Sequence, residues 1–250
     1  MIILKYNNPF LENGSDMRNW HGSEVIEEWY PSIDYDKCDN CSMCLLACGN
    51  RVFAWSENDG KFKVENKSNC VLGCTTCAKL CPEDAISFPY EPKKFITKLL
   101  MKYKIYPKVK EELNKKLEKY PDHKANLKNV NISDDPKNEF SNWHGMKRKD
   151  IIWYPKIDEN KCTGCGLCVV TCSEKRNVFG YDPEKRKDVV LFPNNCMVGC
   201  NNCQIACMWN AITFPDFYQV KNMSKNVLKT SPDLIKKEII EKIKNQGLSI

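Results

Sequence analysis

The chain has 250 residues, of which 42% are hydrophobic and 28% charged, and its formal net charge is +6. That length suits one or two domains, and no apolar run approaches the roughly 18 residues that a membrane-spanning helix needs. The first ten residues hold lysine, asparagine and proline where a secretory signal has an apolar stretch. These features argue against a membrane-spanning or secreted protein, and we expect a soluble, cytoplasmic chain.

In chain order, only short elements precede the first cysteines. Residues 1–17 predict an irregular arm. Residues 20–31 predict an aromatic, partly helical lead that ends at Pro31, because proline cannot continue a helix. A short strand at 32–34 then leads into the first cysteine loop.

Three further strands complete the first small domain. Residues 52–56 and 62–65 predict a hairpin, since Asp59-Gly60 between them is a tight-turn signal. Another strand at 85–88 follows the second group of cysteines. This strand is expected to pair with the first strand and so close the domain.

Two helices follow, and a polar segment separates them from the second half. Pro92 opens a helix that reaches about residue 104 and repeats apolar side chains at four-residue spacing, at Phe95, Leu99 and Tyr103. Pro107 is expected to break this helix, and a second helix continues to about residue 120. Residues 121–137 are polar and predict a linker.

The second half repeats the first at a period of about 124 residues. Matching segments are Asn19–Gly22 with Asn142–Gly145, Trp29–Pro31 with Trp153–Pro155, and Ala85–Pro89 with Ala211–Pro215. The cysteine groups occupy the same places between these markers. We therefore predict an α+β fold with two tandem domains, residues 1–125 and 126–250, each ending in a helical C-terminal extension.

The second half differs mainly in its turn and its last helix. Its hairpin joins strands at 178–181 and 189–192 through a longer, charged turn. Ser231 caps the final helix, Pro232 takes the first position, and Gly247 ends it. We expect the C-terminal helices of both halves to pack back on the domain cores, and docking to a partner protein is the alternative.

All sixteen cysteines fall into four runs, two of the form C-x2-C-x2-C-x3-C and two of the form C-x3-C-x2-C-x3-C. Three closely spaced thiolates and one remote thiolate suit an iron–sulfur cube. Zinc, which usually takes two separated pairs of ligands, is one alternative. Disulfides are a second alternative, although a reducing cytosol disfavours them.

The runs resemble those of the bacterial-type ferredoxins that hold two [4Fe–4S] clusters, and the resemblance covers residues 30–90 and 154–216. It implies two ferredoxin-like dicluster domains and four [4Fe–4S] clusters. In that family the fourth cysteine of each run binds the other cluster. Carried over, the ligand groups are Cys38, Cys41, Cys44 and Cys81; Cys70, Cys74, Cys77 and Cys48; Cys162, Cys165, Cys168 and Cys207; and Cys196, Cys200, Cys203 and Cys172.

The chain departs from the family pattern after the fourth cysteines. Pro82 follows Cys81 as the family usually has it, but Gly49, Ser173 and Met208 stand at the other three places. The x3-x2 spacing also matches the cysteine triad of radical S-adenosylmethionine enzymes, which leave one iron open. Here a fourth cysteine is available for every cluster, and no barrel-length segment surrounds the triad.

The remaining candidates are weaker. His21 and His144 recur in Trp-His-Gly, and we expect packed or hydrogen-bonded structural histidines, with a role beside a cluster as the alternative. Lys93-Lys94 and the run from Lys147 to Lys149 are interpreted as solvated charges. No acid–base pair, activated nucleophile or phosphate loop stands out, so we expect no catalytic residues and no enzyme.

These patterns predict an electron transfer protein of low potential that relays single electrons between oxidoreductases. Binding of four clusters through sixteen thiolates would bring the net charge from +6 to about −2, so the basic composition does not indicate nucleic acid. The alternative is a fixed electron-wiring subunit of a larger redox complex. The sequence names neither the donor nor the acceptor, and it leaves the oligomeric state open.

Overall fold

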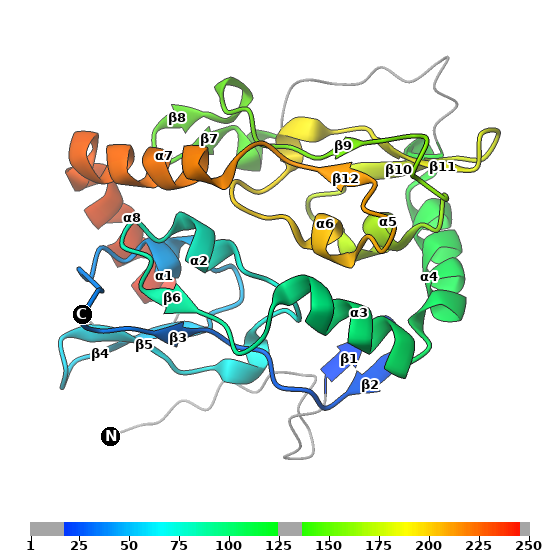
Figure 1. Ribbon diagram of the computed structural model, residues 1–250. Coiled ribbons are helices and arrows are strands. Elements are labelled where there is room, and N and C mark those ends of the chain that lie inside the picture. The colour runs from blue at the N-terminus through cyan, green and yellow to red at the C-terminus, as the bar shows by residue number, and fades with distance from the viewer. Residues whose placement is uncertain (1–17, 125–136, 246–250) are drawn as a thin grey trace.

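The computed structural model describes residues 18–124 and 137–245, which form two similar halves facing each other (Figure 1). The predicted arm at 1–17, most of the predicted linker, and the helix end at Gly247 lie outside the described residues. Within the described ranges, no helix has both the length and the apolar character needed to cross a bilayer.

The first half begins with a hairpin where the sequence predicted a partly helical lead. Strand β1 (Arg18–Trp20) pairs antiparallel with β2 (Ser23–Val25). Both turn residues have positive φ, at 48° for His21 and 65° for Gly22. Two positive φ values make the tight turn whose twist matches a hairpin, so the prediction was wrong because turn geometry, and not aromatic content, decides this segment.

Each half then builds a small domain from two-stranded sheets and two short helices that follow the cysteine loops. In the first half, β3 pairs with β6 as predicted, with Ile33 opposite Ile86, and β4 pairs with β5. The elements are β3 (Ser32–Ile33), α1 (Met43–Ala47), β4 (Phe53–Ser56), β5 (Lys61–Val64), α2 (Thr76–Leu80) and β6 (Ile86–Ser87).

The second half repeats this plan. Strand β9 pairs with β12, β10 pairs with β11, and a hairpin of β7 and β8 precedes them. The elements are β7 (Asn142–Trp143), β8 (Met146–Lys147), β9 (Lys156–Ile157), α5 (Leu167–Thr171), β10 (Phe179–Asp182), β11 (Lys187–Val190), α6 (Asn202–Ala206) and β12 (Ile212–Thr213). Short 3-10 turns lie at Lys67–Asn69, Pro121–His123, Asn138–Phe140, Arg148–Asp150 and Pro193–Asn195.

Two longer helices follow the cysteines of each half. They are α3 (Pro92–Lys102) and α4 (Ile105–Lys119) in the first half, and α7 (Phe217–Thr230) and α8 (Pro232–Asn245) in the second. Pro107 does not break a helix as predicted, because it lies in the first turn of α4, where its missing N–H would have no helical partner anyway. The chain reverses instead at Lys104, whose φ is 49°.

These long helices cross over between the halves. Helix α3 contacts α6 and α4 contacts α5, while α7 contacts α2 and α8 contacts α1. Figure 1 shows α4 beside α5 and α8 beside α1. The helices therefore do pack on domain cores, as expected, but each pair covers cysteine-bearing helices of the opposite half.

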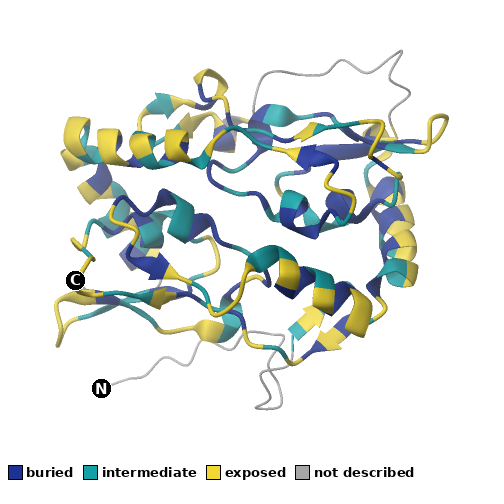
Figure 2. Cartoon of the chain, viewed as in Figure 1, coloured by how far each residue is buried: buried dark blue, intermediate teal, exposed yellow. Residues whose placement is uncertain are grey.

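The hydrophobic cores are shared for the same reason. The core around the fully buried Trp29 includes Leu167 and Ile243 from the second half. The core around the fully buried Trp153 includes Leu80 and Leu113 from the first half. Figure 2 shows the buried residues gathered on the surfaces that the two halves turn toward each other, with exposed residues along the outer sides of α3, α4 and α7. The two halves thus stabilise each other through apolar contacts as well as helix packing.

Candidate metal centres

Residues in the left-handed backbone region shape the first cysteine loop of each half. Gly164 and Gly166 have φ of 66° and 76°, and at the same places in the first half Asn40 and Ser42 have φ of 60° and 67°. This backbone folds the loop back on itself before α5 or α1 begins. Three cysteines of each run are thereby gathered over one short stretch.

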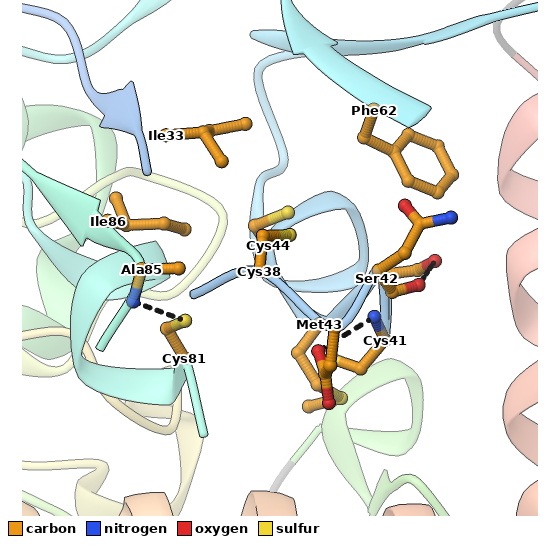
Figure 3. A pocket seen from close by; sticks show the side chains of 12 residues that line it. Ile33, Cys38, Cys41, Ser42, Met43, Cys44, Phe62, Cys81, Ala85 and Ile86 are labelled. Carbon is orange, nitrogen blue, oxygen red and sulfur yellow. Dashed lines mark hydrogen bonds between the residues drawn. The ribbon is translucent and has the colours of Figure 1, made fainter. Parts of the chain in front are cut away.

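The first cavity collects four cysteines from both runs of the first half. Its lining includes Cys38, Cys41 and Cys44 from the first run and Cys81 from the second, closed by apolar side chains such as Phe62. In Figure 3, Cys81 approaches from the side of β6 while Cys38 and Cys44 come from the first loop. The Cys81 sulfur accepts a hydrogen bond from the Ala85 amide at 3.3 Å.

A second cavity collects the other four cysteines of this half. Cys48, the last cysteine of the first run, lies in its lining with Cys70, Cys74 and Cys77. Met197 from the second half also lines this cavity. The structure thus brings the fourth cysteine of each run to the first three cysteines of the other run.

The second half gathers its cysteines in the same crossed way. Burial raises the pKa of Cys203 well above its usual range, and the neighbours that add to the shift are Cys196, Cys200 and Cys172. Burial likewise raises the pKa of Cys165, with a smaller contribution from Cys207. A fourth cysteine again lies beside the thiols of the other run.

The donor set fits a cluster better than a single ion. All sixteen cysteines are free thiols, and burial raises the pKa of most of them, so ionised thiolates here require a compensating positive centre. Among residues 18–124 and 137–245, no three His, Cys, Asp or Glu side chains gather closely enough to hold one metal ion. A four-iron cube keeps its thiolates apart because the cube lies between them.

The two repeated histidines have the structural role that the sequence favoured. The Nδ1 atom of His21 lies 2.7 Å from Oε2 of Glu112 on α4. His144 makes the equivalent contact with Glu238 on α8. Each histidine therefore ties the first hairpin of its half to a long helix.

Two charge runs that were interpreted as solvated contain buried cations. Arg148 is only 2% exposed, and its Nε donates to the Cys196 carbonyl at 3.0 Å. Lys93 is half-buried and donates to the carbonyls of Gln204 and Cys207. The interpretation was wrong for Arg148 and Lys93, because these side chains reach the main chain beside cysteines, but Lys94, Lys147 and Lys149 are exposed as predicted.

Sequence reasoning missed four further charged side chains beside cysteines. Lys116 on α4 donates to the carbonyls of Val169 and Cys172, at 2.7 and 2.8 Å. Burial lowers the pKa of Lys79 to about 8, and the thiols of both halves oppose that shift. The remaining two are Arg18 and Asp188, which lie near Cys70 and Cys162 respectively. Lys116 lies three residues after Leu113 and seven after Val109, on the apolar face of α4, so helical periodicity was the signal that could have marked it.

Comparisons with known proteins agree with this geometry. A family model described as a 4Fe-4S dicluster domain matches residues 37–97 and 161–211. An uncharacterized ferredoxin of Methanocaldococcus jannaschii is 51% identical over 81 residues, which are 32% of this chain and 52% of that protein. The chain therefore spans about half the length of that relative.

Two other relatives are covered more fully. Ferredoxin-3 of Nostoc sp. is 33% identical over 79 residues, covering 25% of this chain and 80% of that protein. The pyruvate synthase subunit PorD of Methanocaldococcus jannaschii is 30% identical over 82 residues, covering 33% of this chain and 90% of that protein. No solved structure matches the chain.

Proposed function

The chain belongs to the ferredoxins that carry 4Fe-4S dicluster domains, and we propose that it relays single electrons at low potential between protein oxidoreductases. Two dicluster domains and sixteen cysteines account for four [4Fe–4S] clusters. When bound, each cluster supplies one-electron redox chemistry. The residues around it hold it in place, exclude water and set its potential.

The ligand assignment is part of this proposal. We assign one cluster to each of four groups: Cys38, Cys41, Cys44 and Cys81; Cys70, Cys74, Cys77 and Cys48; Cys162, Cys165, Cys168 and Cys207; and Cys196, Cys200, Cys203 and Cys172. The observation that carries the proposal is the lining of the two cavities in the first half, each of which contains one complete group. The crossed neighbours in the second half support the same assignment.

The proposed domain organisation and the type of protein follow from this ligand assignment. We take residues 1–125 and 126–250 as the two repeat units, each a ferredoxin-like domain with a helical C-terminal extension. Four thiolates per cluster leave no iron open for a substrate, so we propose an electron carrier without catalytic residues. Clustered thiols kept for metal are typical of a reducing compartment, which favours the cytoplasm.

An iron count and a redox titration of the anaerobically purified chain test this function. We expect about 16 irons and four one-electron centres that are reduced near or below about −400 mV, detected by electron paramagnetic resonance (EPR). Zinc in place of iron, with no signal on reduction, would refute electron transfer. A full iron count with potentials above zero would refute the low-potential role and leave the clusters in place.

A second candidate is a fixed wiring subunit of a larger redox enzyme. The similarity to a pyruvate synthase subunit, over 90% of that protein, favours it. Size-exclusion chromatography of native extract separates the two candidates. A free carrier elutes near its 29.0 kDa mass, whereas a subunit elutes with its complex.

A further inference from the structure

The four cysteine groups differ in where they lie. The two junction groups, which are Cys48 with Cys70, Cys74 and Cys77, and Cys172 with Cys196, Cys200 and Cys203, meet where the halves touch. Burial raises the pKa of Cys200 to about 11, and the largest contribution from a neighbouring group comes from Cys74 of the other half. The other two groups, called the outer groups, are Cys38, Cys41, Cys44 and Cys81, and Cys162, Cys165, Cys168 and Cys207.

Two glycines beside junction cysteines lie close to neighbouring side chains. A Cβ atom added to Gly199, beside Cys200, would lie 3.0 Å from the Leu80 side chain in the first half. A Cβ atom added to Gly73, beside Cys74, would lie 2.6 Å from Ile96 and 3.5 Å from Ile205. Gly199 is therefore pressed against the opposite half, whereas Gly73 is tight against Ile96 of its own half and in ordinary contact with Ile205 of the other.

Lys79 lies between the two junction groups. Its Nζ donates to Oδ1 of Asn201 and sits 4.6 Å from the centre of the Phe217 ring, both in the second half. Thiols of both junction groups raise the pKa of Lys79 against the effect of burial, and Cys200 and Cys74 contribute most among them. The equivalent position of the second half is the uncharged Ile205, so only the first half has a cation at this position.

Four more cations lie against the junction groups. The Arg18 Nη1 atom donates to the Cys70 carbonyl at 2.6 Å, and the Arg148 Nη2 atom donates to the Cys196 carbonyl at 2.9 Å. Lys116 donates to the Cys172 carbonyl at 2.8 Å. Lys242 donates to the Leu46 carbonyl at 3.0 Å and lowers the pKa of Cys48 against the effect of burial. The acceptors of these hydrogen bonds are uncharged carbonyl oxygens, so the bonds do not neutralise the cations. Their positive charge therefore acts on the nearby thiolates.

The outer groups have acidic neighbours instead. Asp188 is 3% exposed, its Oδ2 accepts from the Gly166 amide at 3.2 Å, and it lies 3.9 Å from the Cys162 sulfur. Its other oxygen is buried and has no hydrogen-bond partner within the described part of the chain. In the first half Phe62 takes the same place in the hairpin.

Other charges at the outer groups are weaker or mixed. Asp39 and Asp84 act on Cys41 and Cys81 from the surface, where water screens them. Lys187 donates to the Cys162 carbonyl and so offsets part of the effect of Asp188. Lys93 donates to the Cys207 carbonyl and so places a positive charge beside the same outer group. The outer groups therefore carry acids or balanced charges, while buried or partly buried cations surround the junction groups.

We propose that these side chains order the cluster potentials, so that the two junction clusters are reduced before the two outer clusters and together store two electrons where the halves meet. A nearby positive charge stabilises the added electron, a nearby carboxylate opposes it, and burial keeps both effects from being screened. The proposal rests on the proposed function, since it concerns the potentials of bound clusters. A pair of reduced centres at the junction would suit a partner that takes two electrons.

An EPR-monitored titration with charge variants tests this order. In the unmodified chain we expect half of the reducible spins to appear at the higher potential, with broadening from interaction between the two reduced centres. Lys116→Gln should lower the potential of one higher-potential centre, because it removes a cation beside Cys172. Lys115→Gln is the matched control, since Lys115 lies on the same helix but is 70% exposed and pairs with Glu111. Asp188→Asn should raise the potential of one lower-potential centre.

A Cys172→Ser variant, which alters one junction centre, identifies the wave that belongs to it. The proposal is overturned if all four centres are reduced together, or if Lys116→Gln with full iron content shifts no higher-potential wave beyond the Lys115→Gln control. A low iron count in the unmodified chain would instead refute the proposed function itself, so the two failures are distinguishable.

Discussion

The close contact at Gly164 makes a quantitative prediction about the first cysteine loop of the second half. A Cβ atom at this residue would lie 1.8 Å from the Arg186 carbonyl oxygen in the turn between β10 and β11. An ordinary contact begins at 3.4 Å. Gly164→Ala must therefore push apart two backbone segments, and no flexible side chain can yield in their place.

Two other glycines separate this clash from the general effects of substituting alanine. Gly49 has an ordinary backbone and open space, so Gly49→Ala should be neutral or stabilise by about 0.4–1 kcal/mol. Gly60 has φ of +59° and open space, so Gly60→Ala should cost about 1–2 kcal/mol from the left-handed backbone alone. Gly164 has φ of +66° and pays this cost together with the clash.

We expect the clash to add about 1–3 kcal/mol, as overpacking in a dense interior does. For a chain of this size that corresponds to a melting temperature lower than that of Gly60→Ala by roughly 2–12 °C. The measurement is an anaerobic thermal scan that follows far-ultraviolet circular dichroism and cluster absorbance, with iron counted beforehand. Equal midpoints for Gly164→Ala and Gly60→Ala would show that the hairpin does not clamp the cysteine loop.

Four further predictions address ligands, pH and packing. Cys81→Ala should remove about four irons and the signal of the cluster held by Cys38, Cys41 and Cys44; loss of the Cys70 group's signal instead would contradict the exchange of fourth ligands. Burial lowers the pKa of His123 below its ordinary 6.5, so the unfolded chain binds the proton more readily and stability falls as the pH drops through ~6.5. His123→Gln should flatten that decline in denaturation curves between pH ~7 and ~5, and an unchanged slope would exclude His123 as its source. Leu80→Ala removes a side chain that is 1% exposed in the shared core, and it should cost about 2–5 kcal/mol in denaturant unfolding; a loss below about 1 kcal/mol would mean that the halves pack loosely there. Anaerobic removal of iron should lower the melting temperature sharply, since each cluster joins two cysteine runs, and an apoprotein that melts with the holoprotein would disprove that role.

The sequence predicted the parts of the site that depend on local spacing. The four cysteine runs, the pairing of the strands at 32–34 and 85–88, and the hairpin at Asp59-Gly60 are all set within a few residues or by the repeat. The first hairpin was mispredicted because its turn depends on the backbone of His21. The local sequence pattern therefore predicts loops and strands whose structure depends on residue spacing. It fails where a single residue with an unusual φ determines the structure.

The repeat in the sequence could not predict which charged side chains lie beside the clusters. Arg18 and Arg148 both donate to a tryptophan carbonyl and to a cysteine carbonyl at equivalent places in the two halves. They come from different positions, since Arg18 is the first residue of its hairpin and Arg148 directly follows its hairpin. A residue-by-residue comparison of the two halves does not align Arg18 with Arg148. Only the folded backbone brings the two side chains to equivalent sites.

The crossing of the long helices has a consequence for how such a chain arises. A single half, alone in solution, would expose the faces of α1 and α2 that helices of the other half cover, and the faces of its own long helices that reach across. Two copies would solve both problems at once by a self-complementary twofold contact. Joining them in one polypeptide makes that contact intramolecular, so that its formation no longer depends on protein concentration. Once joined, the two copies were free to diverge. The position that holds Phe62 in one hairpin holds the buried Asp188 in the other.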